Sequence, residues 1–469
     1  MEQPHRKFGS LAMKHNRLSE GRAAGMRRDR LLVIGAGPVG LGMANALKAH
    51  GIAYDQVDAN DGVGGLWRHT VYKTAHIVSS KRSTAYADFP MPADYPDFPS
   101  AGQMLAYLED FAVRRGLLAN IETSKKVLRA FPLHDHSWHV MFEDGEQRIY
   151  KGVVVCNGHH WHKRMPTYPG VFAGRIMHSK DYREPADLAG RRVLVIGGGN
   201  SACDIACEAA RVGRSCDLSL RSGYWFLPKT AFGRPLSDLP IWGLPVWLQR
   251  LILRAIIRIV IGDYRDYGLP RPNHRLFERH PTYGTDLLGY IRLGRIKPRV
   301  EIDCYDGSIV RFKDGSTGEY DLIVAGTGYH NSFPFLPKGL LRVENEAVQV
   351  YGGAFPDNIK NLYIVGWVQA RNGFGSLLTP AADLYARLIR MQDELQPPLG
   401  AILRELAEPL PTSQIVDPGQ ARRQIWLGRR LLWLVRWKGR RMARNQNAVT
   451  ILPDDRFEFE ASAPSLPVN

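Results

Sequence analysis

The 469-residue sequence lacks several features that define large protein classes. It has no uninterrupted apolar run of the roughly 18 residues that a membrane-spanning helix requires. Its five cysteines form no CxxC pair, which argues against a disulfide framework and a dithiol redox centre and favours a reducing cytoplasm. The central region of the chain also lacks the alternation of basic and aromatic residues typical of RNA-binding proteins, so we expect no nucleic-acid partner.

Basic residues outnumber acids in two segments, one at the start of the chain and one at residues 421–444, where acids are absent. Residues 1–30 contain eight Lys and Arg against three acids, and residues 421–444 contain nine against none, within a net charge of +16. The central region is therefore close to neutral, and the basic pI says little about its substrate. Residues 1–29 lack hydrophobic periodicity and are interpreted as a basic, disordered extension. Two further interpretations of this extension stay open: it is a transit peptide, or translation starts at Met26.

The segment 31–51 has the pattern of a strand, a tight turn and a helix. Glycines in GxGxxG spacing permit the turn, the close approach of a pyrophosphate and close packing of the helix, whose N-terminus presents free N–H groups to phosphates. The glycines are Gly35, Gly37 and Gly40, and the predicted helix begins at Pro38. Asp58 ends a second apolar run roughly 20 residues later, where an acid can bind a ribose hydroxyl. This pattern predicts a first dinucleotide site.

A second copy of this unit occupies residues 191–206. Its fingerprint is Gly197, Gly199 and Ala202, with Asn200 and Ser201 at the start of the predicted helix. The second strand of this copy is followed by Arg221 instead of an acid. An acid would repel a 2′-phosphate, whereas a guanidinium pairs with one, so this site is predicted to bind NADP. The alternative is that Arg221 is an ordinary charge at a strand end.

Further motifs lie around the two fingerprints. They are the GGLW segment at 64–67, the proline-rich loops at 88–92 and 95–99, the GHH segment at 158–160, FxGxxxHxxxY at Phe172, Gly174, His178 and Tyr182, and DLIVAGTGY at 321–329. In this order, and together with both fingerprints, they resemble the flavin-containing monooxygenases, which are class B flavoprotein monooxygenases. The resemblance extends from residue 30 to about residue 395.

The resemblance implies an α/β fold with two Rossmann-like dinucleotide-binding domains, the NADP domain being inserted in a discontinuous FAD domain. The expected divisions are an extension (1–29), a first FAD-domain segment (30–168), the NADP domain (169–321) with a helical insertion (223–300), a second FAD-domain segment (322–400) and a basic amphipathic tail (401–469). The residues expected at FAD are Gly35, Gly37, Pro38, Gly40, Asp58, Gly65, Leu66, Trp67 and Gly328. Those expected at NADP are Gly197, Gly199, Asn200, Ser201, Ala202, Arg221 and His178.

By resemblance, the protein is an NADPH-dependent enzyme that transfers one oxygen atom of O₂ to the nitrogen or sulfur of a small organic substrate through a flavin hydroperoxide. The flavin carries the chemistry, so no side chain is assigned as catalytic; His178 and Ser79 are candidates only. Many relatives have a flavin-side Asn where this chain has Val78, and Ser79 or Ser80 could replace its amide. Baeyer–Villiger oxidation of ketones and oxidative decarboxylation of a 2-oxo acid stay open. Val78 favours a further alternative, an uncoupled redox sensor that binds FAD and NADP.

Three other segments have less specific patterns. His159, His160 and His162 have no spaced Cys, Asp or Glu that would complete a ligand set, so we predict no metal site. The apolar segment 242–261 carries Arg250, Arg254 and Arg258 at helical spacing, which indicates a lid helix with a solvated stripe or a helix that touches a membrane surface. Residues 421–444 combine three tryptophans with nine basic residues, a composition typical of an interfacial helix and of peripheral membrane contact. A homodimer remains open.

Overall fold

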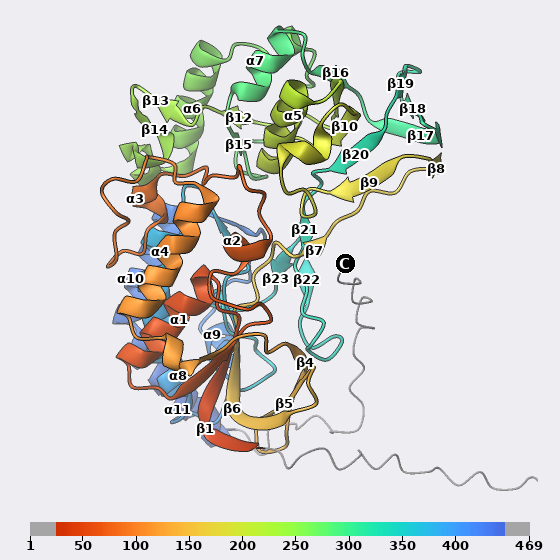
Figure 1. Ribbon diagram of the computed structural model, residues 1–469. Coiled ribbons are helices and arrows are strands. Elements are labelled where there is room, and N and C mark those ends of the chain that lie inside the picture. The colour runs from red at the N-terminus through yellow and green to blue at the C-terminus, as the bar shows by residue number, and fades with distance from the viewer. Residues whose placement is uncertain (1–24, 446–469) are drawn as a thin grey trace, which may run out of the picture.

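The computed structural model describes residues 25–445. Figure 1 shows one sheet in the lower half of the molecule and another in the upper half. The lower sheet has the order β3-β2-β1-β6-β5-β4, and β24 also pairs with β6. Its strands are β1 (Gly25–Ile34), β2 (Tyr54–Val57), β3 (Ile121–Glu122), β4 (Val127–Pro132), β5 (Trp138–Phe142), β6 (Gln147–Val155) and β24 (Leu362–Ile364). Residues 31–34 are all buried, as expected for a parallel strand covered on both faces.

The upper sheet is entirely parallel, in the order β16-β11-β10-β20-β9. Its strands are β9 (Arg175–His178), β10 (Arg192–Ile196), β11 (Ser215–Ser219), β16 (Lys297–Arg299) and β20 (Leu322–Ala325). A smaller sheet extends outward from it and contains β8 (Gly170–Phe172), β17 (Ile302–Gly307), β18 (Ile309–Phe312) and β19 (Thr317–Glu319). Helices α5 (Asn200–Val212) and α7 (Asp286–Arg292) pack against each other beside the upper sheet.

The upper domain is inserted between strands of the lower one, because β24 returns to pair with β6 after the upper sheet is complete. This is the predicted architecture, but three of the predicted boundaries differ. Strand β1 begins at Gly25, so the extension ends before residue 29. Strand β20 pairs with β10, so the chain leaves the upper sheet after Ala325 and not at residue 322. Strand β16 pairs with β11, so the insertion ends before residue 300. Periodicity alone does not reveal which sheet a short apolar strand joins.

Helices cover the lower sheet. They are α1 (Pro38–Ala49), α2 (Leu66–His69), α3 (Lys81–Thr84), α4 (Ala101–Arg114) and α8 (Gly375–Gln392), of which α1 and α8 pack together. Thr379 followed by Pro380 has the pattern of a helix N-cap and first turn, which predicts a helix start at Thr379, but α8 begins four residues earlier and contains Pro380. The Thr379 hydroxyl does not cap the helix; it accepts a hydrogen bond from Ala87 N at 3.1 Å. Thr379 and Pro380 therefore lie inside the helix and do not mark its start.

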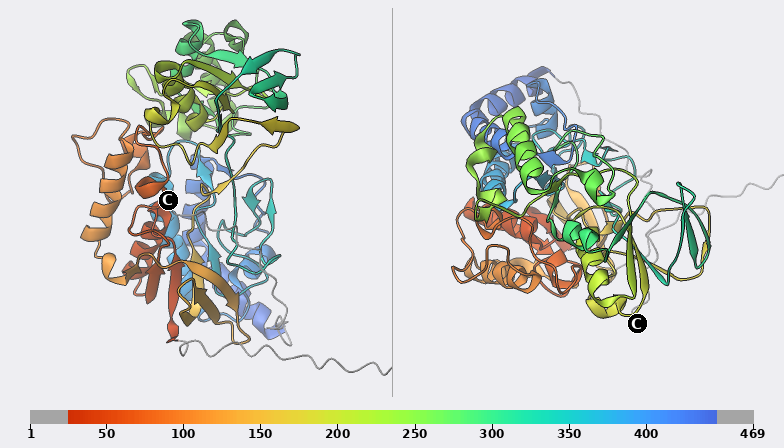
Figure 2. Two further views of the ribbon diagram at one scale, coloured as in Figure 1. Left: turned by 45° about the vertical axis from the view of Figure 1, so that its right-hand side comes forward. Right: turned by 90° about the horizontal axis from the view of Figure 1, so that it is seen from above.

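The insertion in the upper domain contains β12 (Phe226–Leu227), β13 (Thr230–Ala231), β14 (Arg234–Pro235), α6 (Val246–Val260) and β15 (Thr282–Tyr283). Helix α6 starts later than expected, since Trp242 is buried in a preceding 3-10 turn. Its arginines are not simply solvated: Arg250 Nε donates to Leu276 O at 2.9 Å, and the Arg254 guanidinium lies 5.8 Å from the centre of the Trp225 ring. The 3-10 turn at Pro240–Gly243 that precedes α6 packs against the C-terminal helix Pro418–Arg430; seen from above in Figure 2, α6 lies over the C-terminal helices in projection.

The segment expected to be a C-terminal tail belongs to the lower domain as far as residue 445. It contains α9 (Leu399–Glu405), β26 (Ile415–Val416), α10 (Pro418–Arg430) and α11 (Leu432–Asn445). Strand β26 pairs with β25 (Gln369–Ala370), α10 packs on α8, and α11 packs on α9. The predicted single interfacial helix is two helices separated at Leu431, and its inner side is held by apolar contacts. Within residues 25–445, no helix combines the length and apolarity needed to cross a membrane.

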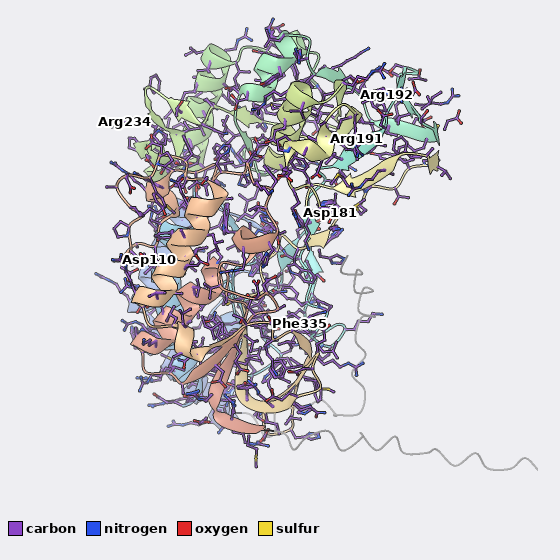
Figure 3. All side chains as sticks on the ribbon, in the orientation of Figure 1. Asp110, Asp181, Arg191, Arg192, Arg234 and Phe335 are labelled. Carbon is purple, nitrogen blue, oxygen red and sulfur yellow. The ribbon has the colours of Figure 1, made fainter. Side chains whose placement is uncertain are left out.

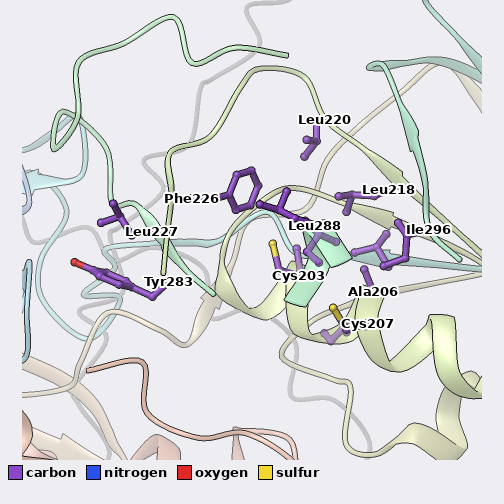
Figure 4. Packing of buried hydrophobic residues seen from close by; sticks show 14 of the residues in the cluster. Cys203, Ala206, Cys207, Leu218, Leu220, Phe226, Leu227, Tyr283, Leu288 and Ile296 are labelled. Carbon is purple, nitrogen blue, oxygen red and sulfur yellow. The ribbon is translucent and has the colours of Figure 1, made fainter. Parts of the chain in front are cut away.

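The remaining short strands join the two domains or lie beside the lower sheet. They are β7 (His162–Lys163), β21 (Tyr329–His330), β22 (Val343–Glu344) and β23 (Ala347–Val348). Strands β7 and β21 pair antiparallel on the two connections between the domains. Near them, Asp181, labelled in Figure 3 where the domains meet, pairs with Lys163 Nζ at 2.5 Å. Separate apolar cores fill each domain, and Figure 4 shows Cys203 and Cys207 as ordinary members of the upper one.

Candidate cofactor site between two nucleotide-binding domains

The first fingerprint loop has the space and the free donors that a pyrophosphate needs. A Cβ on Gly35 would lie 2.4 Å from Cys156 O, and one on Gly40 would lie 1.9 Å from Gly35 O, so both glycines are required by the fold itself. A Cβ on Gly37 would meet nothing closer than 3.5 Å. Helix α1 has no side-chain cap at Gly37, and Pro38 follows at its first position. The first-turn N–H groups of α1 are therefore left for a ligand.

Asp58 and the GGLW segment lie against this loop. Asp58 is buried at the end of β2, and its carboxylate accepts hydrogen bonds from Ala36 N at 2.6 Å and Asn60 N at 2.8 Å. The carboxylate thus fastens the fingerprint loop and keeps lone pairs for a ribose hydroxyl. A Cβ on Gly65, whose φ is +58°, would lie 2.9 Å from Gly37 Cα. Helix α2 then begins at Leu66.

The second fingerprint repeats this arrangement in the upper domain. Helix α5 has no side-chain cap at Gly199, and a Cβ on Gly199 would meet no atom within 4 Å. Gly197 has a φ of +110°, and its Cβ would lie 2.4 Å from Gly326 O. Ala202, fully buried, is accommodated because residue 326 is also glycine. Ser201 is half-buried in the first turn of α5. The N-terminus of α5 is as open to a phosphate as that of α1.

Arg221 is exposed immediately after β11, at the position predicted to select the 2′-phosphate. The residue next to it, Ser222, accepts a hydrogen bond from Arg279 Nη1 at 3.4 Å. Arg279 is not predicted from the sequence, since it lies 57 residues away from Ser222 and belongs to no motif. A guanidinium pairs with a phosphate, so Arg279 is a second candidate beside Arg221 for binding the 2′-phosphate.

The motif histidine is fully buried. His178 Nε2 lies 3.0 Å from Gly328 O, and Lys180 N donates to His178 Nδ1 at 3.1 Å. Burial lowers its pKa, so the ring is neutral at pH 7. Because backbone groups occupy both ring nitrogens, the expected contact of His178 with NADP is not supported. Its role here is to fix β9 to the turn at Gly328 that leads back to the lower domain.

The Ser79 and Ser80 hydroxyls are likewise held by protein groups. Ser79 Oγ lies 2.7 Å from Thr84 Oγ1. Ser80 caps α3, accepting from Ser83 N at 3.1 Å, and it also donates to Asp238 in the upper domain. Val78 packs against the upper-domain core. Neither serine is therefore free to replace the amide that Val78 lacks.

The two halves are joined directly beside α5. Tyr283 N donates to Asn200 Oδ1 at 2.8 Å, and the Tyr283 hydroxyl donates to Arg371 O in the lower domain at 2.6 Å. Asn200 is therefore used to hold Tyr283 and, through it, the lower domain. Trp67 completes the junction by packing against the apolar cores of both domains.

The histidine-rich segment 158–162 contacts the part of the lower domain that directly follows β24. His159 Nδ1 lies 3.0 Å from Gly366 O, whereas its Nε2 is buried without a hydrogen-bond partner. Burial lowers the pKa of His159. Among residues 25–445, no group of three His, Cys, Asp or Glu side chains is arranged to hold a metal ion.

Comparisons with known proteins identify the family of the chain. The profile of the family described as Flavin-binding monooxygenase-like matches residues 28–392. Flavin-containing monooxygenase 5 of Oryctolagus cuniculus is 32% identical over 393 residues, which are 77% of this chain and 73% of that protein. Two solved structures share the fold. S-allyl-L-cysteine S-oxygenase from Allium sativum has a TM-score of 0.61 at 21% identity, covering 90% of this chain and 93% of that one. An open form of cyclohexanone monooxygenase has a TM-score of 0.66 at 18% identity, covering 88% and 99%.

The glycine cradles, the two uncapped helix N-termini and the exposed Arg221 fit FAD in the lower domain and NADPH in the upper one. Together with the match over 28–392, they show that this chain belongs to the flavin-containing monooxygenase family, whose members are FAD- and NADPH-dependent oxidoreductases.

Proposed function

We propose that the protein is an NADPH-dependent monooxygenase that transfers one oxygen atom of O₂ to the nitrogen or sulfur of a small organic substrate. The observation that supports this most directly is the link through Tyr283. It ties the open N-terminus of the second nucleotide helix to the lower domain, which supports a function that requires hydride transfer between two nucleotides.

The chain's own residues bind and enclose the cofactors. Gly37, Pro38, Asp58 and the segment 65–67 hold FAD, while Gly199, Ser201, Arg221 and Arg279 hold NADPH. The bound flavin supplies the redox chemistry: NADPH provides the electrons, one oxygen atom enters the substrate, and the other leaves as water with a proton from solvent. Trp67 and Val78 line the junction with apolar groups, which excludes water from it.

The preference for a soft nucleophile is supported by Tyr182. Its hydroxyl donates to the buried carboxylate of Glu208, which also accepts from Thr74. Ketone-oxidising relatives usually have Trp at this position, and an indole would change the hydrogen bonding of Glu208. The Allium S-oxygenase shares the fold, as does cyclohexanone monooxygenase, so the fold is compatible with either substrate class.

The test is an aerobic assay of the FAD-loaded protein with NADPH and a panel of tertiary amines, sulfides and ketones. Product mass is read alongside NADPH consumption and hydrogen peroxide release. An N-oxide or sulfoxide formed in proportion to the NADPH consumed is the expected result. Esters or lactones from ketones would instead identify a Baeyer–Villiger enzyme. Complete recovery of the electrons as peroxide with every substrate would identify the uncoupled redox sensor.

A second candidate function, peripheral attachment to the cytoplasmic face of an anionic membrane, is favoured by the exposed face of α10 and α11. Trp426, Trp433 and Trp437 are 53%, 65% and 50% exposed. The Arg430 and Arg441 guanidiniums lie 4.1 and 5.5 Å from the ring centres of Trp426 and Trp437. Indole rings beside cations on a surface helix suit the headgroup region of a membrane.

Flotation with liposomes that contain or lack anionic lipid, at low and high salt, tests this attachment. We expect co-flotation with anionic liposomes that weakens at high salt and in the Trp433→Ala, Trp437→Ala double variant. Val171→Ala, which removes an apolar side chain that is 79% exposed on β8 of the outer sheet, is the control for loss of a surface apolar group away from α10 and α11. Absence of flotation under all conditions would contradict the attachment.

A further inference from the structure

The segment 371–373 lies where the two domains meet beside the residues that follow Val78. On one side, Arg371 O accepts from the Tyr283 hydroxyl of the upper domain. On the other, a Cβ on Gly373 would lie 2.6 Å from Ser83 O, so this segment touches α3, the short helix that follows Val78. Two residues later, α8 begins without a side-chain cap at Phe374. The segment is thus placed between the expected FAD and NADP sites.

Asn372, in the middle of this segment, is only 8% exposed, and its Oδ1 has no hydrogen-bond partner among residues 25–445. A buried amide group without a partner costs free energy, and such groups in native proteins usually have a ligand or a functional reason. The positive end of the α8 dipole lies next to it, which favours an electron-rich group at the same place. Burial, the missing partner and the dipole all point to a ligand with a polar edge.

The segment 78–80, which the family resemblance places beside the flavin, offers no free side-chain amide or hydroxyl. Val78 is apolar, and the Ser79 and Ser80 hydroxyls already bond to Thr84 and Asp238. We propose that Asn372 binds the polar pyrimidine edge of the flavin ring and supplies the side-chain amide that is missing at position 78. A rotatable amide suits this edge, which alternates hydrogen-bond donors and acceptors. The inference rests on the proposed function, because it requires FAD in the lower domain.

The inference is tested on FAD binding and on the flavin spectrum, which need no substrate. In the Asn372→Ala variant we expect the Kd for FAD, measured by flavin fluorescence, to rise about tenfold, since a hydrogen bond contributes up to about that factor. The shift of the flavin absorption band on addition of NADP⁺ should also decrease. Asn372→Leu, which has nearly the same size but offers neither the acceptor nor the donor of the amide, is the second variant and should raise the Kd in the same way. Melting of the apoprotein reports folding separately.

Two further variants make the result specific. Asn331→Ala removes another amide whose Oδ1 is buried without a partner, at a different place in the lower domain, and should leave both readouts unchanged. Val78→Asn in the Asn372→Ala background should restore the Kd to within about threefold of wild type. Unchanged FAD binding and spectra in both Asn372 variants would overturn the inference, and failure of the rescue would overturn the link to position 78. If the wild type binds FAD without oxygenating any substrate, the proposed function fails while these readouts still decide the role of Asn372.

Discussion

Arg371 Nη1 lies 2.7 Å from Asp417 Oδ2, and the two side chains are only 10% and 8% exposed. Asp417 is outside the family match, which ends at residue 392, whereas Arg371 is inside it. The same guanidinium lies 4.4 Å from the centre of the Phe277 ring in the upper-domain insertion. One buried cation thus connects the FAD domain, the NADP domain and the C-terminal segment, immediately beside Asn372.

Loss of this ion pair should destabilise the protein. In Asp417→Ala, Arg371 would be a buried charge without a counterion, and we expect the free energy of unfolding to fall by about 3–5 kcal/mol in urea denaturation. Asp417 also caps α10 by accepting from Gln420 N at 2.7 Å. Asp417→Ser keeps a capping oxygen without the charge, so its free energy of unfolding should fall by most of the same amount. The control is Asp110→Ala, which removes an exposed ion pair with Arg114 worth about 0.5 kcal/mol. Equal effects at the two aspartates would contradict this prediction.

Substitutions of glycines in the two fingerprints should separate effects on NADP⁺ binding from effects on folding. In Gly199→Ala the new methyl group enters open space, so the apoprotein should melt normally while the Kd for NADP⁺ rises at least tenfold by loss of the phosphate approach. In Gly40→Ala the methyl group would collide with Gly35 O, and the apoprotein itself should be destabilised. Calorimetric melting and NADP⁺ titration measure the two effects. Normal NADP⁺ affinity in Gly199→Ala would exclude a phosphate at the start of α5.

Arg221 should distinguish the two nicotinamide cofactors. We expect Arg221→Ala to raise the KM for NADPH about tenfold or more and to leave that for NADH nearly unchanged, because only NADPH carries the 2′-phosphate. Arg279→Ala should act in the same direction through the neighbouring guanidinium. Steady-state NAD(P)H oxidation measures both values. Arg311→Ala, which removes an exposed arginine paired with Asp306 in the outer sheet, is the control. A parallel loss of NADPH and NADH use would assign Arg221 a structural role.

Acid should weaken the fold through His178. Burial lowers its pKa in the folded protein, so below about pH 6.5 the unfolded chain binds a proton that the folded chain does not. Stability is therefore full above that pH and declines as the pH falls, by at most about 1.4 kcal/mol per unit for this one group. Urea midpoints of wild type and His178→Gln from pH 8 to 5.5 should converge, since the variant lacks this proton uptake. A gap that stays constant with pH would show that His178 does not contribute.

Much of the architecture could be predicted from local patterns. Two glycine fingerprints, each between a buried strand and a helix, are sufficient for two nucleotide-binding domains, because turn, phosphate approach and helix packing each require glycine or alanine at a fixed position. Because these patterns are local, they do not show which sheet a strand joins, and the predicted domain boundaries are wrong for this reason. The sequence places the strand at 322–325 in the lower domain, because its apolar run would be buried equally well in either sheet.

The roles of single polar residues depend on partners distant in sequence. His178 matches a motif, yet both of its ring nitrogens are used by backbone groups. Asn200 is expected at NADP, yet its Oδ1 holds Tyr283, which is 83 residues away. Arg279 and Asn372 belong to no pattern, and only folding brings them to Ser222 and to the domain junction.

The sequence by itself determined the two nucleotide folds, their order along the chain and the family, because these follow from glycine spacing and apolar periodicity over short segments. Only the tertiary structure decided which strand joins which sheet, that residues 399–445 pack on the FAD domain, and which polar groups remain without partners. The physical reason is that hydrogen-bond satisfaction and burial are set by contacts between segments far apart in the chain, and periodicity within one segment does not contain them.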